Sequence, residues 1–288
     1  MAIKISKTII EKAYCNAFYV PNLKNNFMKK VIKVFLINLI SNYRKIVSLI
    51  NFFLVKISLI FVRNKQSISF PIFVNNKNLI EKAKELDTNG WCFIENFLDD
   101  ESYLKIKNNW PKNFFLKFKN NPIKFYYIGL EYIEAYPKKF LDLDKKIISI
   151  YPELENYYKY LLSNKMQNFV NMLTNKNDFK CHSIACTTSW PKSFLAPHVD
   201  TIAVEDDFKN TINCLHFIDG NDDEIEYSGA TGIYEDNEFK KKIFIPSSLR
   251  NSVLIYNSKI NFYHGFNVMK KNTFRKAIGF QFFSEGKN

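Results

Sequence analysis

The chain has 288 residues, of which 47% are hydrophobic and 16% aromatic, so it can bury a sizeable core and is neither disordered nor fibrous. Glycine is scarce, with eight residues, and no phosphate-binding loop of the GxGxxG or GxxxxGK[ST] kind occurs. Five cysteines without a CxxC pair argue against a disulfide scaffold or a zinc ribbon, and we expect a reducing, cytoplasmic compartment and no cleavable signal segment.

The net charge of +13 is concentrated near the N-terminus. Residues 1–66 contain 12 of the 41 basic residues and a single acid, Glu11. The remaining body has 29 basic and 27 acidic residues and is therefore nearly neutral. This distribution argues against nucleic acid as a partner of the body and separates an N-terminal arm, residues 1–66, from the rest.

Within the arm, residues 28–65 are mainly apolar, are interrupted by basic residues and lack glycine and proline, which favours a helix. The longest apolar run, residues 46–62, includes Lys56 and is shorter than the roughly 20 residues of a membrane-spanning helix. Two alternatives stay open. The helix lies on an anionic membrane surface, at the inner face of a membrane, or it packs on the body or on a partner protein.

The first part of the body alternates helices with isolated strands. Asp99 is placed to cap a helix that Pro111 stops, and Pro152 is placed to open another. Helices are predicted at 78–87, 99–109, 138–149 and 152–174, and strands at 91–94 and 124–133.

After residue 175 the pattern changes to short β-type runs separated by turn residues, which predicts a sandwich or barrel and not a parallel α/β sheet. The predicted strands are 181–189, 195–204, 211–218, 230–235, 242–246, 251–257, 260–266 and 274–283.

The four histidines of the chain, His182, His198, His216 and His264, all lie in this β-rich part. In the triplet His198-Val199-Asp200, the first and third side chains project from the same face of a strand, so they can occupy two adjacent positions of a metal. A third ligand must come from another strand, and His264 follows a later apolar strand. Two histidines and one carboxylate form the ligand set of non-haem Fe(II) oxygenases.

Arg275 follows His264 by eleven residues, across a predicted turn, on the strand that would return toward the metal. A guanidinium group there can hold a carboxylate through two parallel hydrogen bonds. The far end of a 2-oxoglutarate co-substrate needs such a contact, while its keto acid end chelates iron.

The order His198-x-Asp200, His264, Arg275 resembles the Fe(II)- and 2-oxoglutarate-dependent dioxygenase superfamily, especially its prolyl-hydroxylase-like and phytanoyl-hydroxylase-like groups. The likeness covers residues 78–284. It implies an α+β protein with a double-stranded β-helix (jelly roll), in which the first three residues bind Fe(II) and Arg275 binds 2-oxoglutarate, with O2 as the other co-substrate. The domain would span 67–288, with helical support at 77–175 and a jelly-roll core at 181–284.

Two positions depart from the superfamily pattern. Two residues after the arginine stands Ala277, where many members have a serine or threonine that helps hold the carboxylate. The strand of His216 often carries a tyrosine that contacts the co-substrate. His216 and Asn213 are both candidates for that position, and the alternative stays open.

The expected activity is hydroxylation of an unactivated C–H bond in a small molecule or a peptide, and Asp200 favours hydroxylation over halogenation. A non-catalytic jelly-roll binding or scaffold protein, tethered to a membrane, is the alternative. His182 and the cysteines Cys181 and Cys186 are interpreted as structural, and the acidic run 219–226 as a solvated loop.

Overall fold

The computed structural model describes most of the body and only single positions of the N-terminal arm. It describes residues 50, 53, 57, 60, 61, 70–75, 77–111, 117–119, 127–135, 148–199, 211–236, 238–257 and 262–284.

Helices lie mainly in the first half of the described chain and strands in the second. The described helices are α3 (Leu79–Asn89), α4 (Asp100–Asn108), α6 (Pro152–Leu161), α7 (Asn164–Thr174) and the 3-10 turn η4 (Ile225–Tyr227). The described strands are β1 (Trp91–Ile94), β2 (Lys117–Lys119), β3 (Tyr127–Ala135), β4 (Lys180–His198), β5 (Thr211–Gly220), β6 (Gly232–Tyr234), β7 (Lys242–Phe244), β8 (Ser252–Asn257), β9 (Tyr263–Phe266) and β10 (Arg275–Phe283).

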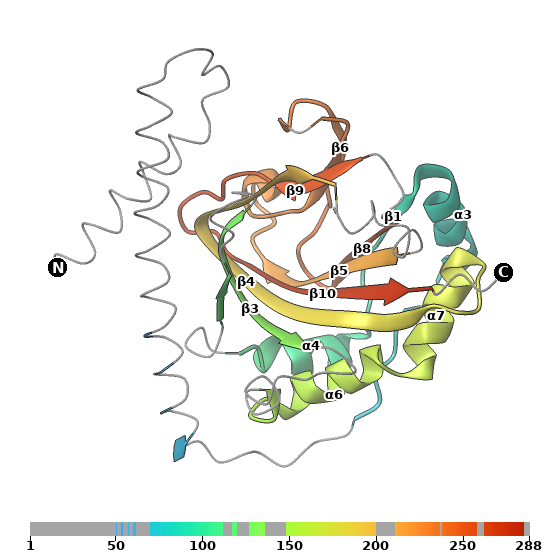
Figure 1. Cartoon of the computed structure of the whole chain (residues 1–288), viewed down its shortest axis with the longest axis horizontal. Helices are drawn as coiled ribbons and strands as arrows, with labels where there is room; N and C mark the ends of the chain where they lie inside the picture. The colour runs from blue at the N-terminus through green and yellow to red at the C-terminus, as the bar shows by residue number, and fades with distance from the viewer. Residues whose placement is uncertain are drawn as a thin grey trace.

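All pairings between these strands are antiparallel, in the order β1-β8-β5-β10-β4-β9-β6-β7, with β3 also pairing with β4 and β2 with β3. The long strand β4 links two layers, because its first half pairs with β10 and its end pairs with β9. In Figure 1, β4 sweeps from the layer of β10 and β5 up to the layer of β9 and β6. We call the first layer, β1-β8-β5-β10-β4, the main sheet.

The bend in β4 has a local cause. Pro191 has no amide hydrogen for the ladder, and the Trp190 amide donates a hydrogen bond to the Ser193 hydroxyl at 3.0 Å instead of to a neighbouring strand. The pairing with β3 shifts register at the same point, where Leu130 faces Ser189 and Ile128 faces Phe194. A bulge of this kind turns a strand sharply, which allows one strand to serve both layers.

The two faces of the main sheet have different neighbours. Helices α4, α6 and α7 lie under one face in Figure 1. This helix-facing side carries Cys214 of β5, Ile255 of β8 and Phe280 of β10, which share a core with Tyr157 and Leu161 of α6. The opposite side faces β6 and β9, and we call it the inner face.

The helices begin where the sequence predicts. Asp99 caps α4, because its carboxylate accepts a hydrogen bond from the Ser102 amide at 3.1 Å. Pro152 stands in the first turn of α6, where a missing amide hydrogen costs nothing.

The single helix predicted at 152–174 is wrong: the structure has two helices, α6 and α7. The turn between them closes with hydrogen bonds from the Leu162 amide to the Tyr158 carbonyl and from the Ser163 amide and hydroxyl to the Tyr160 carbonyl. A serine that caps the backbone in this way competes with helix continuation, and Ser163 becomes the N-cap residue of α7.

Several predicted elements fall partly or wholly outside the described residues. The predicted helix 138–149 is described only from residue 148, and the predicted strand 195–204 only as far as residue 199. In the arm, Ile50, Phe53, Ile57, Ile60 and Phe61 are helical and exposed, and the other arm residues lie outside the description. Over the part of the chain that is described, no helix has the length and apolar character needed to cross a membrane.

Candidate functional site

Two of the predicted metal ligands lie side by side. His198 at the end of β4 and His264 in β9 are direct partners in the antiparallel pairing, and their ring centroids are 4.3 Å apart at an interplanar angle of 49°. Residues that pair directly project from the same face of a sheet. Ile233 of β6 also pairs with His264 and packs in the inner cluster with Phe217 and Leu254. Both imidazoles therefore lie on the inner side.

The third predicted ligand, Asp200, lies outside the described residues, two positions after His198. Within the described ranges, no group of three or more His, Cys, Asp and Glu side chains gathers as a metal site. The two imidazoles nevertheless fit a shared metal, because they come from neighbouring strands and stand as close as two adjacent ligands require.

Tyr256 of β8 extends this inner surface and was missed in the sequence. Its ring centroid lies 4.8 Å from that of His264. Tyr256 pairs directly with Trp91 of β1, whose ring stacks on Phe244 at 4.2 Å. These half-buried aromatic rings line the inner side next to the histidines. The available signal was the aromatic residues at alternate positions 91 and 93 of one predicted strand and at 256 of another. The same residues are equally typical of a hydrophobic core, so the signal did not indicate a site.

Arg275 is almost completely buried, at 3% exposure, on the inner face at the start of β10. Its Nη1 atom donates hydrogen bonds to the Gly229 carbonyl and to the Thr231 hydroxyl, both at 2.9 Å. The guanidinium carbon lies 4.5 Å from the ring centroid of Phe266, two residues after His264, and 5.9 Å from that of Phe217. The arginine and the histidines thus share the space between the two layers.

The charge of Arg275 is not neutralised by any described residue, since no carboxylate of the described ranges lies within ion-pair distance of it. Burial lowers the pKa of Arg275 to about 9, and the nearby Tyr256 opposes this change, so the group is still a cation at pH 7. Its buried Nε atom has no hydrogen-bond partner in the structure. A buried cation with an unsatisfied donor is costly, and an anion would remove both costs.

Gly229 makes the close approach to Arg275 possible. A Cβ atom on this residue would lie 3.3 Å from both the Cβ and the Cδ of Arg275 and 3.1 Å from the Met269 sulfur. Its φ of 94° also disfavours any other residue. The loop before β6 therefore covers the arginine stem with backbone alone.

The two alternatives for a further co-substrate contact lie on opposite faces of β5. Asn213 pairs with Tyr256 and Gln281 and shares the inner face with them. His216 faces the helices, where its Nδ1 lies 2.7 Å from the Tyr157 hydroxyl and its ring packs on Phe97. The main sheet separates His216 from the inner space, so Asn213 is the one of the two candidates that faces it.

The cysteines and His182, which were interpreted as structural, have the surroundings of structural residues. Cys186 and Cys214 are buried in the helix-facing core, and burial raises the pKa of both thiols well above the ordinary range. Burial also raises the pKa of Cys181 to about 12. His182 packs against Phe283 on the sheet edge. None of these thiols is a reactive or metal-binding group in its described surroundings.

The acidic run that begins at the end of β5 is partly solvated, as predicted, with Asp223 and Glu224 exposed, and several of its carboxylates form ion pairs. Asp219 lies 3.0 Å from Lys107 and 3.6 Å from Lys276, and Glu224 lies 2.7 Å from Lys270. These pairs balance part of the negative charge of the run within the chain.

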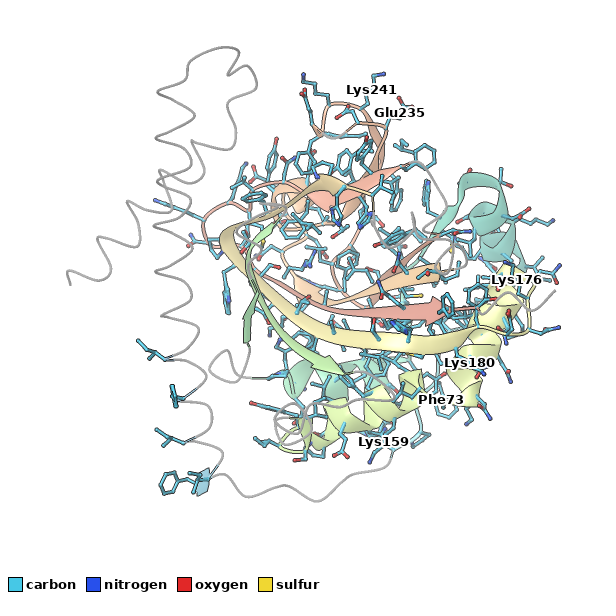
Figure 2. The ribbon with its side chains drawn as sticks, in the orientation of Figure 1. Phe73, Lys159, Lys176, Lys180, Glu235 and Lys241 are labelled. Atoms are coloured by element: carbon cyan, nitrogen blue, oxygen red, sulfur yellow. The ribbon has the colours of Figure 1, made fainter. Side chains whose placement is uncertain are left out.

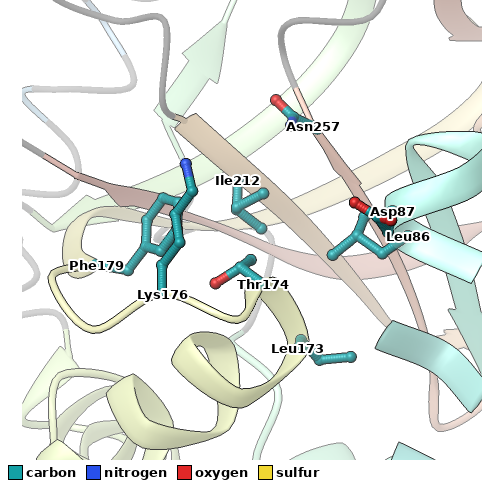
Figure 3. Close-up of a pocket in the computed structure, with 8 residues that line it drawn as sticks. All are labelled: Leu86, Asp87, Leu173, Thr174, Lys176, Phe179, Ile212 and Asn257. Carbon is teal, nitrogen blue, oxygen red and sulfur yellow. The ribbon is translucent and has the colours of Figure 1, made fainter. Parts of the chain in front are cut away.

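A separate cavity of about 70 Å³ lies outside the two-layer space, between α3, α7 and the edge of β5 and β8 (Figure 3). Leu86, Leu173, Phe179 and Ile212 supply an apolar lining, with Lys176 at the rim. This cavity is too small for more than a few water molecules.

Charged side chains also lie at the periphery of the molecule. In Figure 2, Lys159 lies on the side of the helices, and Glu235 and Lys241 lie near the opposite end.

Known proteins resemble this chain in structure and not in sequence. No protein-family profile matches it, and no curated protein matches it by sequence. Its fold is shared by many solved structures, among them the following three. An oxidoreductase of the 2OG-Fe(II) oxygenase family from Burkholderia pseudomallei is 12% identical, with a TM-score of 0.50, and the match covers 78% of this chain and 97% of that one.

The other two structures are prolyl hydroxylases. That of Pseudomonas putida, a prolyl-4-hydroxylase, is 12% identical with a TM-score of 0.51, and the match covers 72% of this chain and all of that one. That of Trichoplax adhaerens, in complex with a peptide fragment of the hypoxia inducible factor oxygen degradation domain, is 15% identical with a TM-score of 0.50, covering 73% and 92%. The resemblance stated from the sequence is confirmed at the level of fold: the described body has the fold of 2-oxoglutarate- and Fe(II)-dependent oxygenases, the double-stranded β-helix.

Proposed function

We propose that this protein is an Fe(II)- and 2-oxoglutarate-dependent oxygenase that hydroxylates an unactivated C–H bond of a small molecule or a peptide. One observation carries the proposal. A buried cation with an unsatisfied donor, Arg275, lies in the same inner space as two facing histidines, His198 and His264. A scaffold protein has no use for either feature, and the buried cation is costly to keep.

Fe(II) would be held by His198, Asp200 and His264, and when bound it supplies the oxidising chemistry with O2 and 2-oxoglutarate. The chain supplies ligation and orientation. The pairing of β4 with β9 fixes both imidazoles on one side, and the 4.8 Å contact with Tyr256 restrains the ring of His264. Restraint of ligands by such neighbours is what holds a metal site in one geometry.

2-Oxoglutarate would place its distal carboxylate against Arg275. The Nη1 atom is already engaged by Gly229 and Thr231, so the Nε side of the guanidinium is the one that can receive the carboxylate. Phe217 and Phe266 flank the group and exclude water, which strengthens a charge-assisted hydrogen bond. Asn213 is the candidate for a further contact on the same face.

The substrate would approach the histidines along the aromatic side formed by Trp91, Phe244 and Tyr256. Aromatic walls with a few polar groups are typical of sites for small molecules and for peptide side chains. The peptide bound to the Trichoplax prolyl hydroxylase supports the peptide alternative.

The arm would attach the enzyme to the inner face of an anionic membrane. Ile50, Phe53, Ile57 and Ile60 recur at helical spacing and are all more than half exposed, and basic residues surround them in the sequence. An exposed apolar stripe in a basic segment fits a lipid surface better than water.

The test is anaerobic loading of the full-length protein with Fe(II), followed by metal analysis and a search for succinate production against a panel of metabolites and peptides. His198→Ala, Asp200→Ala and His264→Ala should each lose stoichiometric iron while keeping the fold. His182→Ala is the matched control, because it removes an imidazole from the other end of the same strand, where His182 packs against Phe283. Stoichiometric iron in the three ligand variants would refute the metal site, and failure of the parent to bind iron would favour the scaffold alternative.

A further inference from the structure

Ser189 is a second unsatisfied polar group beside Arg275. It is fully buried on β4, and its hydroxyl has no hydrogen-bond partner in the structure. Ser189 and Arg275 are direct partners in the pairing of β4 with β10. Direct partners project from the same face with Cβ atoms roughly 5 Å apart, so the hydroxyl and the stem of the arginine are neighbours on the inner face.

The adjacent hydroxyl groups of β4 confirm this orientation. Thr188 faces the helices, where its hydroxyl accepts a hydrogen bond from the Trp110 indole at 2.9 Å. Thr187 faces inward like Ser189, but its hydroxyl already donates to the Ala277 carbonyl at 3.1 Å. Thr231 also contacts the guanidinium, but its hydroxyl accepts the Nη1 hydrogen bond. Each of these threonine hydroxyls has a partner, as donor for Thr187 and as acceptor for Thr188 and Thr231, whereas the Ser189 hydroxyl has neither.

The two unsatisfied groups have the same chemistry, since the Ser189 hydroxyl and the Arg275 Nε–H are both hydrogen-bond donors. Leaving one buried polar group without a partner is costly, and leaving two neighbours so indicates a common acceptor. A carboxylate accepts several hydrogen bonds through its two oxygens and also neutralises the guanidinium charge. Ala277, the next inward-facing residue of β10, has no hydroxyl to take this role.

We infer that Ser189 is the second donor to the carboxylate that Arg275 binds, and that it sets the affinity for the dicarboxylate co-substrate. This inference rests on the proposed function. It assigns the hydroxyl contact to β4 and not to the arginine's own strand. The serine contributes to recognition of the distal carboxylate and leaves the binding of iron and of the keto acid group to other residues.

The test measures binding and not turnover. 2-Oxoglutarate is titrated anaerobically into the full-length Fe(II) protein while the absorbance of the metal chelate is followed, and thermal unfolding of the ligand-free protein is recorded in parallel. Ser189→Ala should raise the Kd for 2-oxoglutarate by about 10- to 100-fold, as expected for a lost hydrogen bond to a charged group. Iron content should be unchanged. The ligand-free variant should unfold at the same temperature as the parent or higher, because a buried unsatisfied hydroxyl has been removed.

Ser183→Ala is the matched control, since Ser183 lies on the same face of β4 and its hydroxyl is satisfied by Gln281 at 2.9 Å. Its Kd for 2-oxoglutarate should equal that of the parent. A second ligand, 2-oxobutanoate, has the keto acid group without the distal carboxylate, so Ser189→Ala should bind it as the parent does.

The outcomes separate the inference from the proposed function. If the parent binds iron but not 2-oxoglutarate, the proposed function fails. If the parent binds 2-oxoglutarate and Ser189→Ala binds it equally well, the inference is overturned while the function stands. If Ser189→Ala weakens both ligands alike or lowers the unfolding temperature, its role is structural and the inference is also overturned.

Discussion

The two faces of the main sheet differ in the kind of buried polar group that they leave without a partner. On the helix-facing side, the His216 Nδ1 meets the Tyr157 hydroxyl and the Trp110 indole meets Thr188, and the group left over is the Nε2 atom of an imidazole that burial keeps neutral. On the inner face, the cation Arg275 and its strand partner Ser189 keep donors that no described residue accepts. A buried unpaired cation costs more stability in the absence of a ligand than a buried neutral ring does, and we therefore expect mutations on the two faces to change different properties.

The largest expected effect on the helix-facing side is that of Phe97→Ala. Phe97 is fully buried between Phe169 and His216, with ring centroids 5.8 Å and 5.0 Å away. Its truncation leaves a cavity and should lower the free energy of unfolding by about 3–5 kcal/mol. Urea unfolding measures this change. At temperatures where the variant is folded, its affinity for 2-oxoglutarate should equal that of the parent, and a large loss of affinity would contradict the division between the faces.

Arg275→Met should show the reverse pattern. Loss of the guanidinium removes a charge-assisted contact and should weaken 2-oxoglutarate binding by at least about 3 kcal/mol, or a few hundredfold. The ligand-free protein should keep or gain stability, because an unpaired buried cation is replaced by an apolar side chain of similar length. Anaerobic titration and thermal unfolding measure the two changes.

Arg275→Lys is the control for this variant, since it keeps the charge and loses the planar fork. It should restore only part of the affinity. Unchanged 2-oxoglutarate affinity in Arg275→Met, with iron still bound, would refute the carboxylate site.

The smallest effect appears only in acid and tests the helix-facing side alone. Burial lowers the pKa of His216 to about 3 from its ordinary value of 6.5. Between these two values the unfolded chain holds a proton that the folded chain lacks, so stability is lost as the pH falls below about 6.5. The expected loss between pH 7 and pH 5 is about 2 kcal/mol.

His216→Asn removes this titration and should flatten the dependence of the unfolding free energy on pH over the same interval. Equal slopes in parent and variant would show that His216 is not the responsible group.

Part of the candidate site could be predicted because it depends on spacing along single strands. The order of short strands with a histidine and an arginine near the end is typical of one superfamily, and the structure brings His198, His264 and Arg275 to the inner side. That His198 and Asp200 share one face stays a prediction, because Asp200 lies outside the described residues. The caps at Asp99 and Pro152 were equally local, since each satisfies or avoids a backbone donor at a helix start.

What the sequence could not determine was which face of each strand is the inside. Alternation separates Asn213 from His216, but only the packing of α6 against β5 decides that His216 is covered by Tyr157 and that Asn213 faces the inner space. The break between α6 and α7 likewise depends on a turn that competes with the helix.

The sequence by itself determined the residue types of the site and the class of fold, because periodicity and spacing act within one strand or helix. The tertiary structure alone decided which groups meet. The partnership of Ser189 with Arg275 joins strands far apart in the chain, and the contact of Tyr256 with His264 joins two consecutive strands that do not pair with each other. The register between such strands is set by the bulge in β4 and by the cores on both faces, which are properties of the whole fold.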